Sequence, residues 1–125
     1  MDKPAFYEYC QMFSSTADKA SVFDKFYDPE ATFAHPFQGT FKGREALVNF
    51  WTCGHQGIHE VLQPTNVLID GDRIAAEFKI EWHCLEDTDY LGPRKKGDVY
   101  YAACAAFYLL KNDKFARVKL YLQEL

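Results

Sequence analysis

The stretch FYDPEATFAHPFQGTFKGREALVNFW, residues 26 to 51, holds a helix end, a strand and a new helix start in close succession. Pro29 ends the helical pattern before it, because proline cannot continue a helix. Residues 31–35, ATFAH, are typical of a short strand. Gly43 occupies a cap position and begins a helix that runs through Trp51. The segments on either side decide which fold uses these elements.

Upstream, the spacing of apolar residues predicts two helices. Residues 4–15 begin with a proline suited to the first helical position and carry aromatic residues three and four positions apart. Residues 17–27 repeat this pattern up to Pro29. The helix that starts at Gly43 is expected to end in the glycine-flanked segment 53–57, CGHQG.

Downstream of Ile58 the period changes from helical to alternating, which indicates strands. Two runs within residues 61–82 are joined by Asp70-Gly71, a favoured hairpin turn. Residues 99–110 are apolar on both faces, as expected of a central strand, and residues 115–125 form a last alternating strand. Helices followed by a meander of strands predict a single α+β domain over residues 1–125, in which a cone-shaped, curved antiparallel sheet wraps around three N-terminal helices and an internal apolar pocket.

Composition narrows the function classes. The chain has 125 residues, of which 48% are hydrophobic, and 14 basic against 18 acidic side chains give a net charge of −4. No basic stripe is present, so we expect no nucleic-acid partner. No apolar run is long enough to span or target a membrane, so we expect no membrane partner and a cytoplasmic location.

Cofactor and metal motifs are also missing from the sequence. It contains neither a glycine-rich phosphate loop nor a dinucleotide fingerprint, and its histidines are not accompanied by suitably placed carboxylates, so we expect no cofactor and no metal. The four cysteines, Cys10, Cys53, Cys84 and Cys104, lie far apart in apolar segments and are interpreted as free thiols.

The 26–51 stretch, together with NVLIDGDRIAAEF (66–78) and KFARVKLYL (114–122), resembles the SnoaL-like branch of the nuclear-transport-factor-2-like superfamily, which includes polyketide cyclases and ketosteroid isomerases. The resemblance covers nearly the whole chain. It implies the same fold as the pattern of elements, and a homodimer packed sheet to sheet.

The resemblance also implies a site. Ketosteroid isomerases keep an aspartate base directly before the proline of the first short strand, and the matching residue here is His35. The isomerase's acidic partners fall at Gln11 and about Ala105, so its oxyanion hole is absent and steroid isomerisation is not expected. Ala103 and Ala105 are expected to point inward and leave room for a different ligand.

Two histidines are candidates for the catalytic pair. The ordinary pKa of His35 lets it accept a proton at neutral pH. By strand alternation His59 shares a face with Val61 and Val67, so it is expected to point toward the cavity mouth, and the pair would then divide acid and base roles, as a histidine pair does in scytalone dehydratase. The alternatives are a hydrogen-bonded core histidine at 35 and a half-solvated residue at 59. His55 is interpreted as a solvated loop residue and His83 as a surface residue.

Other side chains are expected to bind the ligand, either by stacking or by hydrogen bonds. They are Tyr7, Gln11, Tyr27, Phe50, Trp51, Gln63, Phe78, Trp82 and Tyr101. So many rings beside a polar cluster favour an aromatic or polycyclic molecule. The basic loop 85–97 is either a lid or a solvated connection, and the solvated interpretation is preferred.

Two functions follow from this site. The first is a cofactor-independent isomerase or lyase, of dehydratase or cyclase type, that acts on a hydrophobic small molecule by general acid-base chemistry. The second is a small-molecule-binding or dimerisation module of the same fold without chemistry. The position of the two histidines relative to each other and to a cavity separates them.

Overall fold

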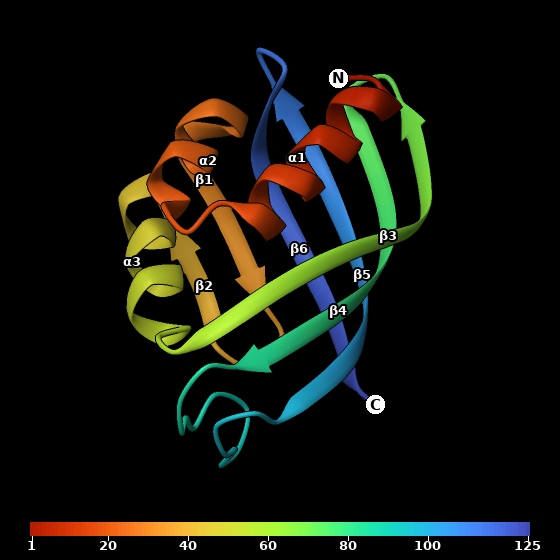
Figure 1. Cartoon of the computed structure of the whole chain (residues 1–125). Helices are drawn as coiled ribbons and strands as arrows, with labels where there is room; N and C mark the ends of the chain where they lie inside the picture. Colours follow the sequence, from red (N-terminus) through yellow and green to blue (C-terminus); the bar gives the residue numbers. More distant parts are fainter.

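The computed structural model describes residues 1–125 and contains three helices and one six-stranded sheet (Figure 1). The helices are α1 (Lys3–Ser15), α2 (Lys19–Phe26) and α3 (Arg44–Gly54). The strands are β1 (Tyr27–His35), β2 (Gly39–Lys42), β3 (Ile58–Asp70), β4 (Arg73–Cys84), β5 (Val99–Lys111) and β6 (Lys114–Glu124). The sheet curls around the helices without closing, so the predicted α+β architecture is confirmed.

The first two helices begin where an aspartate caps them. The Asp2 carboxylate accepts a hydrogen bond from the Ala5 amide at 2.9 Å, and the Asp18 carboxylate accepts one from the Ala20 amide at 3.1 Å. These bonds pair backbone N–H groups that have no partner within the helix. The buried side chains of α1 recur at helical spacing, which turns one face of the helix toward the sheet.

The sheet has the strand order β2-β1-β6-β5-β4-β3. Four of the five pairings are antiparallel, but β1 runs parallel to β6. The sheet is therefore mixed, whereas a wholly antiparallel sheet was predicted. β1 begins before Pro29, although proline has no N–H to donate to a neighbouring strand. The pairing of β1 with β6 is irregular between Tyr27 and Thr32, so no backbone N–H is required at this position. The short β2 was not predicted from the sequence.

Aromatic rings fill the space between the helices and the sheet. Phe6, Tyr9 and Tyr27 lie within 6.1 Å of the Phe115 ring, measured between centroids. The hydroxyls of Tyr9 and Tyr27 are 2.7 Å apart and satisfy each other inside this apolar core. The two hydroxyls in this core are therefore paired with each other. The packed rings fix α1 and α2 against the sheet.

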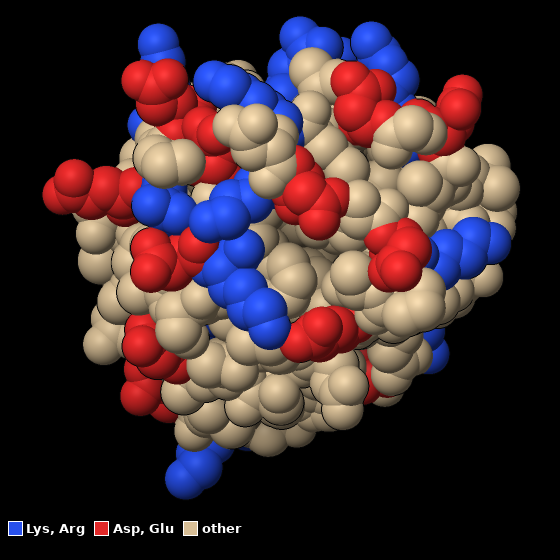
Figure 2. All heavy atoms as spheres, turned by 90° about the horizontal axis from the view of Figure 1, so that it is seen from above, with Lys and Arg blue, Asp and Glu red and all other residues tan.

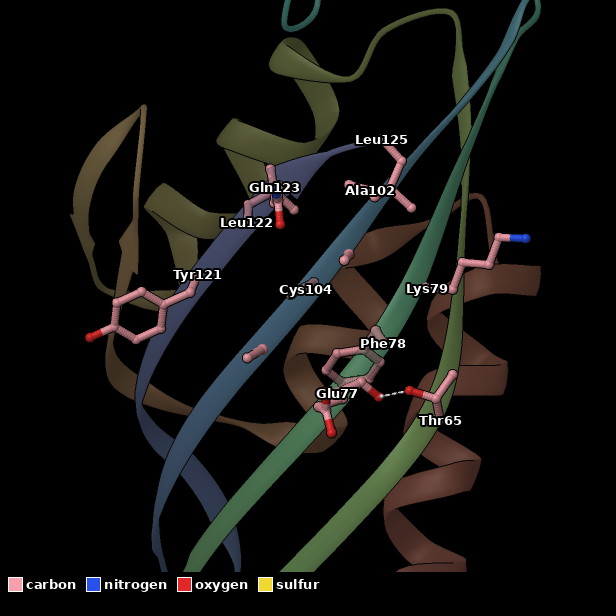
Figure 3. A pocket seen from close by; sticks show the side chains of 12 residues that line it. Thr65, Glu77, Phe78, Lys79, Ala102, Cys104, Tyr121, Leu122, Gln123 and Leu125 are labelled. Carbon is pink, nitrogen blue, oxygen red and sulfur yellow. Dashed lines mark hydrogen bonds between the residues drawn. The ribbon is translucent and has the colours of Figure 1, made fainter.

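The outer face of β5 differs from its prediction. Ala102, Cys104 and Ala106 are buried, whereas Ala103 and Ala105 point outward and form the floor of a groove of about 520 Å³ (Figure 3). The prediction of an inward Ala103 and Ala105 was wrong because a strand that is apolar on both faces carries no signal for which face is inside.

The charges on the surface are mixed. Seen from above, lysine and arginine side chains alternate with aspartate and glutamate, and neither sign covers a continuous area of this face (Figure 2). No helix has the length and apolarity needed to cross a membrane.

Candidate active site

His35 is the last residue of β1, and its imidazole is held by the turn that follows. Nδ1 accepts hydrogen bonds from the amides of Phe37 and Gln38, both at 3.1 Å. An imidazole nitrogen that accepts cannot carry the proton, so the neutral ring is protonated at Nε2. Burial, and secondly the neighbouring His55, lowers the pKa of His35 to about 4. At neutral pH His35 therefore offers an N–H donor rather than a free lone pair.

The Nε2 atom of His35 faces Tyr90, whose hydroxyl oxygen is 3.5 Å away. Tyr90 lies in the loop between β4 and β5. Its ring packs 4.2 Å from the ring of His55 and 5.8 Å from that of Trp82, measured between centroids. Most of this loop is exposed, as the preferred interpretation has it, but Tyr90 is buried and reaches into the domain.

His55 caps the end of α3 and turns inward. Its ring stacks on that of Trp51 with a centroid distance of 5.5 Å and an angle of 7° between the planes. Burial lowers the pKa of His55 to about 4, although the Phe50 carbonyl acts in the opposite direction. The prediction of a solvated loop histidine was wrong, because the glycine-flanked turn folds under the loop that carries Tyr90.

Glu60, on β3, is the only buried carboxylate of the chain. Its Oε2 atom accepts a hydrogen bond from Nε1 of Trp51 at 3.1 Å and lies 3.4 Å from Nε2 of His55. Burial raises the pKa of Glu60 to about 7, and the Trp51 N–H, Lys19 and Trp82 limit that rise. No hydrogen bond engages its other oxygen, Oε1. Glu60 can therefore exchange a proton near neutral pH.

A cavity of about 310 Å³ opens beside this carboxylate. Glu60, His55 and Trp51 form one part of its wall, and the segment between α1 and α2 forms another. That segment adds hydroxyls and the ammonium of Lys19, which donates hydrogen bonds to the carbonyls of Phe13 and Thr16. The volume lies at the lower end of the range for small-molecule sites, roughly 300–1,000 Å³. No group of three or more His, Cys, Asp or Glu side chains is placed to hold a metal ion.

Comparison with known families gives one match, to the SnoaL-like domain, over residues 6–118. The chain belongs to the SnoaL-like domain family. A comparison with curated proteins found no significant match.

Solved structures share the fold of this SnoaL-like domain. A provisionally assigned polyketide cyclase from Xanthomonas campestris is 20% identical, with a TM-score of 0.80 over 94% of this chain and 87% of its own. A nuclear-transport-factor-2-like protein from Anabaena variabilis is also 20% identical, with a TM-score of 0.70 over 96% and 84%. A protein with a ketosteroid isomerase-like fold from Catenulispora acidiphila, solved with trimethylamine, is 12% identical with a TM-score of 0.75 over 97% and 86%.

The SnoaL-like domain does not bring its two predicted catalytic histidines together. His59 is exposed, its Nε2 lies 2.8 Å from the Ser14 carbonyl oxygen, and its ring is 5.9 Å from that of His83. The pairing of β3 with β4 shifts between Pro64 and Asn66, so the two halves of β3 alternate in opposite phase. Val67 is therefore inside while His59 is outside, and the prediction that they share a face was wrong.

The same bulge places Glu60 inside, opposite Trp82 in the ladder. Glu60 was missed because unbroken alternation from Val67 assigns it to the outer face. Pro64 was the available signal, since a proline within a strand commonly marks a bulge or an edge. Tyr90 was missed because it lies in a loop with no periodicity.

The other predicted binding residues lie in four places. Phe50, Trp51 and Trp82 join His35 in the cluster around Glu60 and His55. Tyr27 and Phe78 belong to the aromatic core. Tyr7, Gln11 and Gln63 line a surface groove between α1 and β3 together with His59, and Tyr101 lies on the outer face beneath Lys79.

Proposed function

We propose that this domain is a cofactor-independent isomerase, lyase or cyclase in which Glu60, rather than His35, is the general base. The observation that carries the proposal is the state of the Glu60 carboxyl. It is buried, it has a pKa of about 7, and it lines a cavity with Oε1 free of hydrogen bonds. A base whose pKa is close to the working pH combines the ionised form with a strong tendency to take the proton.

The chemistry follows from the groups around this carboxyl. Oε1 of Glu60 removes a proton from a carbon beside a carbonyl, and the electron pair left behind forms an enolate. The N–H of Trp51 keeps Oε2 oriented, and the ammonium of Lys19 stabilises the negative charge that moves onto the substrate. Return of the proton to another carbon completes an isomerisation, and loss of hydroxide or attack on a second carbonyl gives the lyase or cyclase outcome.

His35 has a different role in this proposal from the one predicted. Its Nδ1 lone pair is occupied by two amides, so Nε2–H is a hydrogen-bond donor, and it faces the Tyr90 hydroxyl beside the cluster rather than the cavity that Glu60 lines. His59 lines the same cavity as Glu60, but its side chain is exposed and its Nε2 is bonded to the Ser14 carbonyl, so the proposal gives it no proton transfer. The substrate is a hydrophobic ring compound small enough for the cavity.

The test is solvent deuterium incorporation by NMR into a panel of cyclic enones and β-diketones. Glu60→Gln should slow exchange by about 100- to 10,000-fold, whereas Glu30→Gln, which changes an exposed carboxylate outside the cavity, should match the wild type. The wild-type rate should rise with pH through about 7, as Glu60 ionises. Equal exchange rates for the wild type and Glu60→Gln would overturn the base assignment. Binding of a panel compound by both proteins without exchange would favour the binding module instead.

We also propose that a second copy of this chain covers the outer face of the sheet. This face carries the exposed ring of Tyr121 at the alanine-floored groove (Figure 3), and the exposed ring of Phe107 lies 6.1 Å from it between centroids. The outward side chains of β4 include Glu77, and those of β6 include Lys119. In a packing whose two-fold axis runs along β5, β4 faces β6 of the partner, so opposite charges meet.

A charge exchange tests this interface by light scattering. Glu77→Lys and Lys119→Glu should each reduce the dimer fraction, and the double variant should restore it. A monomeric wild type, or single variants that dimerise unchanged, would overturn the proposal.

A further inference from the structure

Tyr90 separates the Glu60 cluster from the outside of the domain. On its inner side the ring contacts His55 and Trp82. On its outer side lies a surface hollow of about 510 Å³, to which Tyr90 itself contributes together with Phe50 and neighbouring loop residues. Because Tyr90 forms part of both boundaries, movement of this one side chain would join the hollow to the cluster.

We propose that Tyr90 is a displaceable plug that fills the ring-binding position of the site, and that the substrate presents a single hydroxylated aromatic ring, the size of a phenol, which takes its place. This inference rests on the proposed function for the location of the site. It does not depend on which residue is the base.

The contacts of Tyr90 define what a replacing ring must offer. The His55 ring packs against the phenol 4.2 Å away at a tilt of 42°, and the edge of the ring meets Trp82. The Nε2–H of His35 points at the phenol oxygen, since Nδ1 is committed to the two amides. A hydroxylated aromatic ring satisfies all three contacts, whereas an aliphatic chain or an unsubstituted ring leaves the His35 donor unpaired.

The plugged site is incompletely satisfied, which favours its replacement by a ligand. The Tyr90 hydroxyl is 3.5 Å from Nε2, at the outer limit for a hydrogen bond. Nδ1 of His55 and Nε1 of Trp82 are buried and have no partner in hydrogen-bond geometry, although they lie near enough to the Phe50 carbonyl and to Glu60, respectively, to interact with them weakly. A free ring is not tethered to a loop and can move closer to His35, and further oxygens on it can pair with the remaining nitrogens. Each such pairing recovers part of the penalty of a buried unpaired polar group.

Most of the loop that carries Tyr90 is exposed, and hydrogen bonds rather than buried side chains hold it. Among them are those from the Lys96 amide to Asp87 and from the Leu85 amide to the Gly57 carbonyl. The hydroxyl of Tyr100 donates to the Tyr90 carbonyl at 2.9 Å, and Thr88 and Arg94 exchange two backbone hydrogen bonds. Immediately after Tyr90, Leu91 has a φ of 55° and Gly92 a φ of 113°. A non-glycine residue in the left-handed region carries strain that is relieved when the segment opens. Segments with few buried contacts open at a small fraction of the global unfolding cost.

The experiment uses p-cresol, which is the tyrosine side chain as a free molecule, and toluene, which lacks the hydroxyl. Both tryptophans of the chain lie in the cluster, so their fluorescence reports binding. In Tyr90→Ala, p-cresol should bind saturably and about tenfold more tightly than toluene, because one hydrogen bond distinguishes them. Adding His35→Phe should remove that preference. The matched control is Tyr121→Ala, which removes an exposed tyrosine and should bind p-cresol as weakly as the wild type.

Wild-type protein supplies a second measurement that needs no variant. Arg94, Lys95 and Lys96 make the loop a trypsin substrate. Saturating p-cresol should accelerate cleavage at these residues several-fold, with cleavage elsewhere as an internal reference. Unchanged or slower loop cleavage would overturn the displacement, as would equal binding of p-cresol and toluene by Tyr90→Ala. Both measurements report binding and loop opening rather than deuterium exchange, so a failed base assignment leaves this result standing.

Discussion

Glu60 should make the pH dependence of stability opposite in sign to that of a carboxylate held as an anion by an ion pair, and replacing it by glutamine should remove this effect. The pKa of Glu60 is about 7 in the folded domain, against 4.5 for the free side chain. A raised pKa means that the folded state binds the proton more tightly than the unfolded state. The stability that goes with protonation is therefore fully present below pH 4.5 and is lost as pH rises through about 7.

The magnitude follows from the difference between these two pKa values. One pKa unit corresponds to about 1.4 kcal/mol, so ionisation of Glu60 lowers the free energy of unfolding by about 3 kcal/mol above neutral pH. Glutamine keeps an oxygen acceptor for the Trp51 N–H and cannot ionise. The free energy of unfolding of Glu60→Gln should therefore rise by about 3 kcal/mol relative to that of the wild type as the pH increases from about 5 to about 8.

The assay is urea unfolding, followed by tryptophan fluorescence at several pH values. His35 and His55 also titrate between the folded and unfolded states, with the opposite slope, because their pKa values are lowered to about 4. Subtracting the wild-type curve from the variant curve isolates Glu60. The control is Glu30→Gln, which changes an exposed side chain that makes no hydrogen bond or ion pair. A stability difference that stays constant over this pH range would refute the raised pKa and, with it, the reason for choosing Glu60 as the base.

Two further predictions concern buried hydrogen bonds. Trp51→Phe removes the N–H that donates a hydrogen bond to Oε2 of Glu60. The pKa of Glu60, measured by carbon NMR titration, should therefore rise further by about one unit. A fall in that pKa would show that the N–H does not favour the ionised form. Tyr9→Phe and Tyr27→Phe should each lower the free energy of urea unfolding by about 1 kcal/mol. The double variant should lower it by less than the sum of the two, since the second substitution leaves no unpaired hydroxyl. Strict additivity would contradict the pairing.

Local patterns were sufficient to predict most of the fold. The helices follow from apolar spacing and capping residues, and the long strands follow from alternation and the Asp70-Gly71 turn, because both signals are set by neighbours in the sequence. The parallel pairing of β1 with β6 was not predictable in this way. It joins residues that are far apart in the chain, and the sequence between them contains no signal for the direction of pairing.

The candidate site was predicted only in part. His35 and the Phe50-Trp51 pair came from a family resemblance and do lie together. His55 and Tyr90 were missed because the burial of a loop residue depends on what folds over it, and neither has a periodic neighbour that indicates burial. The tautomer of His35 could not be predicted, for another reason. Its protonated nitrogen is determined by two amides in the following turn, and a sequence motif does not specify hydrogen-bond direction.

The irregularity between Pro64 and Asn66 has an evolutionary consequence. One extra residue in the strand decides which side chain at the start of β3 faces the interior. Loss or gain of a single codon there would turn Glu60 outward and His59 inward, so an imidazole would replace the carboxylic acid. Related chains can therefore differ in the chemical type of their inward group without any substitution at these two positions. When such sequences are aligned, the gap should be placed within the strand, since a gap moved into the neighbouring loop pairs residues that lie on opposite faces of the sheet.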